Sequence, residues 1–243
     1  FQYGPAYHTF WFRLTGQVPS EFEGKTVAVV AELGSERTVW RDNSPFCGLD
    51  VEHSDFGNLE GGEMSRGTTL VRGGEPVELY IQAYTRNPQV RVAGKEPPRE
   101  QLVEKVERAE VVVLNLPVKD LVYDMEFCLS LLETLDSASP SYGILLRALN
   151  DVVNLFPQPD AVARCRKLIR DALGSLNGEV KHTMTAVGHA HLDTAWLWPI
   201  EITKKKMAHT TSTQLGLMER YPDYVFCHSQ ASQYEWLEKE YPE

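Results

Sequence analysis

The chain has 243 residues, of which 42% are hydrophobic and 24% charged, and its formal net charge is −10 at pH 7. Such a composition is that of a globular protein, and the acidic balance excludes nucleic acid, whose phosphates bind a basic surface. No apolar run reaches the roughly 18 residues of a membrane helix, so we expect no membrane association. Four scattered cysteines without a CxxC pair predict free, buried thiols and a cytoplasmic protein: Cys47, Cys128, Cys165 and Cys227.

Residues 1–95 form the first predicted domain, a β-sandwich. Runs rich in Val, Thr and aromatic residues indicate strands in "TFWFRL", "KTVAVVAEL", "TVWR" and "VELYIQAY", while "NSPFCG" and "EGGE" indicate turns. The alternation in "VELYIQAY" predicts one face toward the core and one toward water. The core face would hold Val77, Leu79, Ile81 and Ala83, and the water face Glu78, Tyr80, Gln82 and Tyr84.

Residues 96–180 form a predicted helical connector, which begins at the break "VAGKEPPRE". Apolar residues recur at helical spacing in "LVYDMEFCLSLLETL", "SYGILLRALNDVVNLF" and "DAVARCRKLIRDALGSL". Asp160 is the expected N-cap of the third helix. The run "AEVVVLNL" before these helices is left open, because periodicity alone does not assign it to a strand or a helix.

Residues 181–243 form the third predicted segment, in which strands and helices alternate. "TMTAVG" reads as a buried strand, followed by a helix over "ITKKKMAHTTSTQLGLMERYP", a strand in "YVFCHS" and a helix over "QYEWLEKEY". This order is typical of the start of a parallel α/β sheet. Lys204, Lys205 and Lys206 are expected on a solvated helix face. His182, His209 and His228 are given no role, although His228 follows a strand near the same sheet edge.

The stretch "VGHAHLDTAWLWP" carries the candidate chemistry. His189, His191 and Asp193 occupy alternate positions, so their side chains can converge at a strand end. Imidazole and carboxylate are the usual ligands of zinc, which favours a metal site over a simple polar cluster. Trp196 is the candidate for stacking on a sugar ring, while Trp198 is expected in the core.

The segment "GHAHLDTAWLWP" resembles the signature at the first barrel strand of glycoside hydrolase family 38, the class II α-mannosidases, in its cytosolic and vacuolar branch. The resemblance continues through "LMERYPDYVFCHSQASQYEW". It implies the N-terminal part of a retaining, zinc-dependent hydrolase of terminal α-linked mannose. The implied fold is a multidomain α+β and α/β arrangement: a β-sandwich, a helical connector and the first βα units of the catalytic barrel.

The resemblance also divides the motif into roles. It implies that His191 and Asp193 are zinc ligands, that Trp196 binds the mannose and that His189 only supports its neighbours. The family's nucleophilic aspartate lies in a later segment resembling "LPDTFGYS", a string absent from this sequence. We therefore expect the nucleophile beyond Glu243, no catalytic residue in the chain, and no activity from this segment alone.

A second hypothesis is a non-catalytic fragment that binds carbohydrate or assembles subunits. "TVWRDNSPFCGLD" places Trp40, Arg41 and Asp42 on an expected loop, where they could grip a sugar. Alternatively, Trp40 anchors the sandwich or packs on the catalytic domain. Exposed aromatic residues could also serve subunit contacts, which leaves a homo-oligomer open beside the mannose-containing oligosaccharide as a partner.

Overall fold

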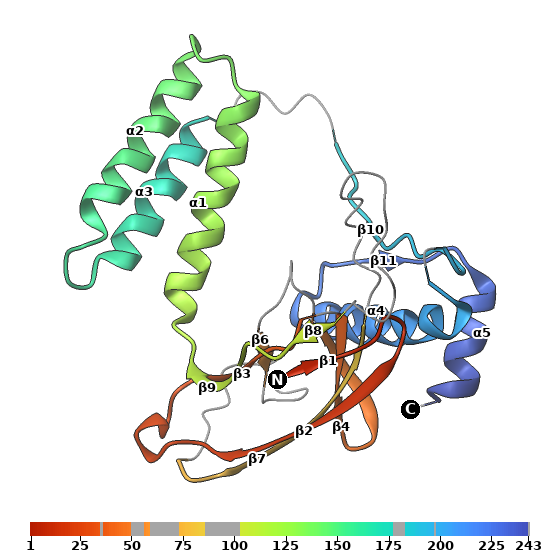
Figure 1. Ribbon diagram of the computed structural model, residues 1–243. Coiled ribbons are helices and arrows are strands. Elements are labelled where there is room, and N and C mark those ends of the chain that lie inside the picture. The colour runs from red at the N-terminus through yellow and green to blue at the C-terminus, as the bar shows by residue number, and fades with distance from the viewer. Residues whose placement is uncertain are drawn as a thin grey trace. The chain divides into compact units, whose positions relative to one another are not determined.

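The computed structural model describes residues 1–34, 36–49, 56–58, 73–85, 103–176, 183–196 and 198–242. The chain divides into two compact units (Figure 1), one formed by Phe1–Val113 with Ala186–Glu243 and the other by Leu114–Thr185. The predicted domain divisions after residues 95 and 180 lie outside the described residues. Within the described parts, none of the helices has the length and apolar character needed to cross a membrane.

Two antiparallel sheets form the β-rich part of the first unit, which confirms the predicted sandwich. One has the strand order β2-β7-β4-β5, and the other has the order β6-β3-β9. Their strands are Thr9–Gln17 (β2), Val27–Glu32 (β3), Glu36–Arg41 (β4), Ser44–Leu49 (β5), Phe56–Asn58 (β6), Pro76–Tyr84 (β7) and Arg108–Val113 (β9). Beside them, β1 (Gln2–Tyr3) pairs with β8 (Glu104–Lys105), and a short 3-10 helix spans Ser20–Phe22.

Two segments of this sandwich differ from the sequence reading or complete it. The turn predicted in "NSPFCG" is wrong, because Ser44–Leu49 is strand β5. The hairpin turn lies just before it, at Asp42 and Asn43, whose positive φ values of 48° and 67° suit a tight two-residue turn. The run "AEVVVLNL", which the sequence did not assign to a strand or a helix, contains most of β9, and β9 pairs antiparallel with β3.

Strand β7 shows how the sandwich core forms and where it is covered from outside. Its predicted core face is confirmed, since Val77, Leu79, Ile81 and Ala83 are all buried. On the opposite face Glu78 and Tyr80 are exposed, but Gln82 and Tyr84 are buried. The water-facing prediction is therefore wrong for the second half of this strand.

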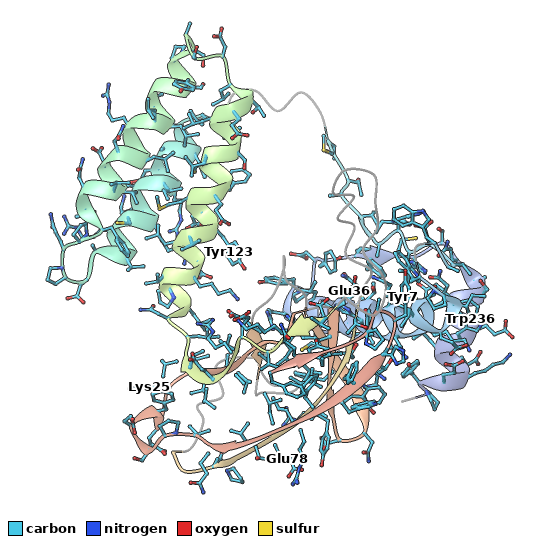
Figure 2. All side chains as sticks on the ribbon, viewed as in Figure 1. Tyr7, Lys25, Glu36, Glu78, Tyr123 and Trp236 are labelled. Atoms are coloured by element: carbon cyan, nitrogen blue, oxygen red, sulfur yellow. The ribbon has the colours of Figure 1, made fainter. Side chains whose placement is uncertain are left out.

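Helix α4 (Ile200–Arg220) explains that burial, because it lies against the outer face of the four-stranded sheet (Figure 1). The backbone N–H of Gly48 in β5 donates to Thr213 Oγ1 of α4 at 2.8 Å. A Cβ atom at Gly48 would overlap the ring of His209, so the close approach requires glycine here. Figure 2 shows Glu36 of β4 beside α4, whereas Glu78 lies away from it.

The second unit contains the three predicted helices: α1 (Leu116–Thr134), α2 (Pro140–Leu155) and α3 (Ala161–Ser175). Their apolar faces share one core that includes Leu121, Cys128, Leu145, Leu149, Val152, Cys165 and Ile169. Asn115 and Ser139 cap the first two helices through their side chains. Asp160 occupies the N-cap position of α3 as predicted, but its backbone is left-handed (φ 53°) and its side chain makes no capping hydrogen bond.

The end of the chain confirms the predicted alternation of strands and helices. Strand β10 (Gly188–His189) pairs in parallel with β11 (Phe226–Cys227), α4 connects them, and α5 (Ala231–Glu240) follows. Of the buried strand predicted over 183–188, only Gly188 lies in a strand, and the prediction is wrong for 183–187, which are irregular and exposed. A buried parallel strand needs covering on both faces, and among the described residues β10 pairs only with β11.

Candidate functional site

The structure brings two of the predicted ligands together just after β10. His191 Nε2 lies 3.2 Å from Asp193 Oδ1, and the two side chains are 75% and 42% exposed. His189 lies elsewhere in the site, with its ring stacked on that of His228 at a centroid distance of 6.3 Å. Of the three candidate ligands, His191 and Asp193 therefore lie together, and His189 does not join them.

This pair fits part of a zinc site. Two ligand atoms bound to one tetrahedral zinc ion at about 2.0–2.2 Å lie about 3.3–3.6 Å apart. The observed separation of 3.2 Å between His191 Nε2 and Asp193 Oδ1 is close to the lower end of that range, and both side chains are accessible to an ion. Across the parts of the chain that the structure describes, no group of three or more His, Cys, Asp or Glu side chains is placed to hold a metal. His191 and Asp193 are thus a pair of ligand-type side chains and not a complete metal site.

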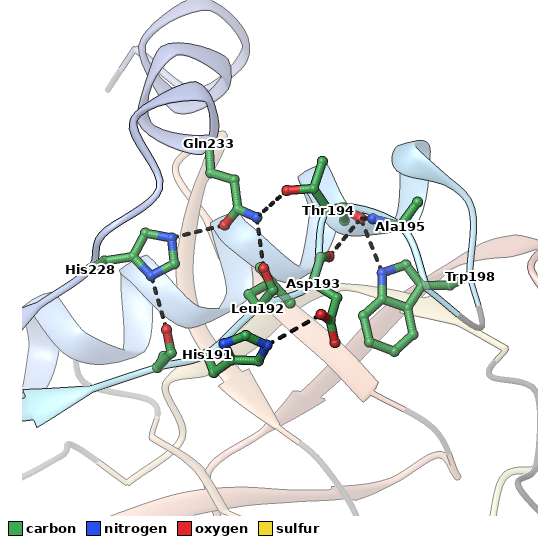
Figure 3. A network of polar contacts seen from close by, with 10 residues as sticks. His191, Leu192, Asp193, Thr194, Ala195, Trp198, His228 and Gln233 are labelled. Carbon is green, nitrogen blue, oxygen red and sulfur yellow. Dashed lines mark hydrogen bonds and ion pairs between the residues drawn. The ribbon is translucent and has the colours of Figure 1, made fainter.

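His228, directly after β11, and Gln233 of α5 hold the backbone on either side of the pair (Figure 3). Gln233 Nε2 donates to the carbonyl of Leu192 at 2.8 Å and to Thr194 Oγ1 at 2.9 Å. His228 Nδ1 lies 3.0 Å from the carbonyl of Ala190, and its Nε2 lies 2.8 Å from Gln233 Oε1. Residues 190, 192 and 194 are therefore held by hydrogen bonds. The residues that alternate with them, His191 and Asp193, face outward.

His228 and Gln233 are functional candidates that the sequence reading missed. Both are buried, which makes their hydrogen bonds costly to lose. Because the Leu192 carbonyl only accepts, the NH₂ group of Gln233 must point toward it. The amide oxygen of Gln233 therefore points toward His228 Nε2, and His228 Nδ1 points toward the Ala190 carbonyl. His228 therefore lies between the Ala190 carbonyl and the amide oxygen of Gln233, and which ring nitrogen donates depends on its tautomer. The available signal was the position of His228 directly after a parallel strand, at the sheet edge where ligands bind.

A second network fastens the segment to the first turn of α4. The buried hydroxyl of Thr203 accepts from the N–H of Ala195 and from Trp198 Nε1, both at 3.0 Å, and donates to the carbonyl of Asp193 at 3.3 Å. Ala195 has a φ of 63°, which is uncommon for a residue with a Cβ atom. The three hydrogen bonds to one side chain stabilise this turn and fix the backbone of Asp193.

The two tryptophans of the motif lie in different environments. Trp196 is 62% exposed and meets the half-buried Trp198 edge to face, with ring centroids 5.8 Å apart. The exposed indole of Trp196 offers a flat apolar surface beside the polar pair, as a sugar-stacking residue requires. Trp198 instead packs inward, onto the helix that follows.

The lysine run is not a solvated face, so that prediction is wrong. Lys204 pairs with Glu240 of α5, Lys205 donates to Thr9 Oγ1 of β2, and Lys206 pairs with Glu36 of β4. The reason is the position of α4, whose first turns run between the four-stranded sheet β2-β7-β4-β5 and α5. An isolated reading of three consecutive lysines contains no information about these neighbours.

Trp40 packs against aromatic residues and does not stand free on a loop. Its ring lies 5.3 Å from that of Trp11 and 5.9 Å from that of Tyr241, centroid to centroid. Tyr241 comes from the third predicted segment, so the contact matches the interpretation in which Trp40 packs on that region. Arg41 and Asp42 form an exposed ion pair at 3.9 Å.

The four cysteines are free thiols in different settings. Cys128 and Cys165 are buried in the helical core as expected, and Cys47 is half-buried. Cys227 is exposed, so the prediction of a buried thiol is wrong there. It lies in the short strand β11, whose outer side no described strand covers.

Comparison with known protein families finds a match for each of the two chain segments that form the first unit. Residues 1–112 match the model of the alpha-mannosidase jelly roll domain, and residues 181–243 match that of the glycosyl hydrolases family 38 N-terminal domain. The chain carries the N-terminal domains of a family 38 glycosyl hydrolase. In this family 38 chain, the His191–Asp193 pair and both networks around it fall within the second of the two matched regions.

Curated relatives of this family 38 chain are named as α-mannosidases. Alpha-mannosidase 2C1 of Homo sapiens is 33% identical over 250 residues, and that of Mus musculus is 32% identical over 246 residues. Both alignments cover 99% of this chain and 23% of the relative. Alpha-mannosidase G of Dictyostelium discoideum is 28% identical over 251 residues, which cover 99% of this chain and 22% of that protein. The chain therefore spans less than a quarter of the length of these relatives.

Proposed function

We propose that this chain is the N-terminal part of a retaining, zinc-dependent α-mannosidase that removes terminal α-linked mannose from oligosaccharides during glycan catabolism. The observation that carries the proposal is the exposed His191–Asp193 pair, placed at the end of a parallel strand inside the matched family 38 region. The four free cysteines support a reducing compartment, and we propose the cytoplasm. We further propose that β10, α4, β11 and α5 are the first βα units of the family's catalytic barrel.

His191 and Asp193 are the residues that would hold the zinc ion. A bound zinc ion supplies positive charge that can bind sugar hydroxyls and stabilise the charge developing in the reaction. The exposed indole of Trp196 would stack on the C–H face of the same sugar ring and orient it. His189, which stacks on His228, would support the backbone of the site without binding the metal.

The covalent chemistry is proposed to come from another part of the catalytic domain. Retaining hydrolysis requires two carboxyl groups about 5 Å apart, one as nucleophile and one as acid. We assign neither role to a residue of this sequence, which lacks a segment like "LPDTFGYS". The contribution of this chain is therefore to bind the metal and to position the sugar.

The activity is tested with the full-length protein that contains this chain. We expect it to hydrolyse an aryl α-mannoside, to leave an aryl β-mannoside intact and to release the α-anomer first, as observed by NMR. Removal of the metal with a chelator should abolish hydrolysis, and added zinc should restore it. Hydrolysis by residues 1–243 alone would contradict the absence of the nucleophile, and release of the β-anomer first would contradict retention.

The metal assignment is tested with two alanine variants of the same full-length protein. His191→Ala should lose zinc during dialysis, because it removes a ligand, whereas His189→Ala should retain most of it. Second-sphere substitutions cost roughly 10–100-fold in metal affinity, while loss of a ligand costs more. Equal zinc content in both variants and in the wild type, measured by atomic emission, would refute the assignment.

A further inference from the structure

A partly buried ion pair joins the four-stranded jelly-roll sheet to α4, the helix that follows the proposed metal-binding segment. The ammonium of Lys206 in α4 contacts both carboxylate oxygens of Glu36 in β4, and the two side chains are only 14% and 23% exposed. The hydroxyl of Tyr84 in β7 also donates to Glu36 Oε2, at 2.5 Å. Glu36 thus binds the Lys206 ammonium through both carboxylate oxygens, and the hydrogen bond from Tyr84 of the neighbouring strand holds that carboxylate in place.

The same ammonium contacts the motif. Lys206 Nζ lies 4.5 Å from the centroid of the Trp198 ring, a distance typical of a cation–π interaction. The indole N–H of Trp198 donates to Thr203, and Thr203 donates to the carbonyl of Asp193. A continuous set of contacts therefore connects Glu36 with the backbone of a candidate zinc ligand.

We propose that Glu36 is a positioning residue of the metal site, acting through Lys206 and Trp198. The proposal rests on the proposed function, since it concerns the site formed by His191 and Asp193. It gives the jelly-roll domain a role in the catalytic domain: one of its strands supplies the anion that keeps Lys206 against the indole.

The physical reason is the cost of leaving a partly buried cation without its anion. In Glu36→Gln the lysine loses its anion and is drawn toward water, away from the ring of Trp198. The indole then loses the cation on its face, and the hydrogen bonds that Thr203 makes to the turn loosen. Asp193 is held less well in the geometry that the metal needs, so zinc binding should weaken.

The test measures the zinc dissociation constant of the full-length enzyme by competition with a chelator, together with kcat and KM for an aryl α-mannoside. We expect Glu36→Gln to weaken zinc binding about tenfold, the low end of the range for residues that support a metal ligand. Glu240→Gln is the matched control, because it also removes the carboxylate partner of an α4 lysine, Lys204, but contacts neither Trp198 nor Thr203. It should leave zinc affinity within about twofold of the wild type.

A double variant separates positioning from stability. Glu36→Gln/Lys206→Met has no unpaired buried charge, so its urea midpoint should recover toward that of the wild type. It also has no cation on Trp198, so its zinc affinity should stay weakened. Recovery of zinc affinity together with stability, or wild-type affinity in Glu36→Gln, would overturn the positioning role. A wild-type enzyme that holds no zinc would instead overturn the proposed function.

Discussion

Gln233 is the side chain whose replacement should disturb the candidate site most. It is fully buried in α5 and makes three hydrogen bonds, to the Leu192 carbonyl, to Thr194 and with His228. Leucine has a similar volume and none of these groups. Gln233→Leu should therefore keep the packing of α5 and leave its partners without hydrogen bonds.

The magnitude follows from the burial of those partners. Thr194 is exposed and can turn to water, whereas the Leu192 carbonyl and the His228 ring belong to buried residues. An unsatisfied buried polar group costs about 1–3 kcal/mol, so two of them cost about 2–6 kcal/mol. The added apolar surface of leucine offsets part of this loss, and we expect a net destabilisation of about 3 kcal/mol.

Urea unfolding followed by tryptophan fluorescence is a suitable assay. The five tryptophans of residues 1–243 lie at positions 11, 40, 196, 198 and 236, so in a protein of these residues alone the signal reports on the first compact unit and not on the helical one. Glu238→Leu is the control, a polar-to-leucine change at an exposed site of the same helix, expected to cost less than about 0.5 kcal/mol. A Gln233→Leu variant as stable as that control would refute the view that these hydrogen bonds hold the segment.

Three further predictions concern other described residues. Thr203→Val should destabilise the first unit by about 2–3 kcal/mol, because the Ala195 N–H and the Trp198 indole N–H lose their acceptor; Thr203→Ser keeps the hydroxyl and should recover most of this in the same urea assay. Burial by itself raises the pKa of Glu36, but the charge and hydrogen bond of Lys206, together with the hydrogen bond of Tyr84, hold the pKa below the ordinary value of 4.5. The stability that this carboxylate contributes is full above pH 4.5 and lost as the pH falls through the lowered pKa, so the difference in unfolding free energy between wild type and Glu36→Gln should shrink in acid; a difference that stays constant from pH 7 to pH 3 would contradict this. Burial raises the pKa of the Cys47 thiol to about 12, so an aromatic disulfide reagent at pH 8 should modify the exposed Cys227 first, and Cys227→Ser should remove the fast phase.

The sequence alone predicted the elements whose pattern is local. The alternation of Val77, Leu79 and Ile81 indicated a strand with one buried face, and the apolar spacing before and after Pro140 indicated two helices. The motif around His191 and Asp193 could also be recognised from the sequence as a candidate metal site, because a run of alternating ligand-type residues after a strand is uncommon. In these cases the residues that determine the structure are neighbours in the chain.

Only the tertiary structure decided the surroundings of the site. Lys206 is close to Trp198 in sequence but 170 residues from Glu36, the anion that pairs with it. Gln233 lies 41 residues from the carbonyl it holds at Leu192. The local sequence around a lysine run or a glutamine contains no periodic pattern that would predict which distant residue it contacts. The burial and the partner of a side chain depend on which distant elements pack together. Here α4 packs against the jelly-roll sheet, and α5 packs against residues 190–194 of the motif.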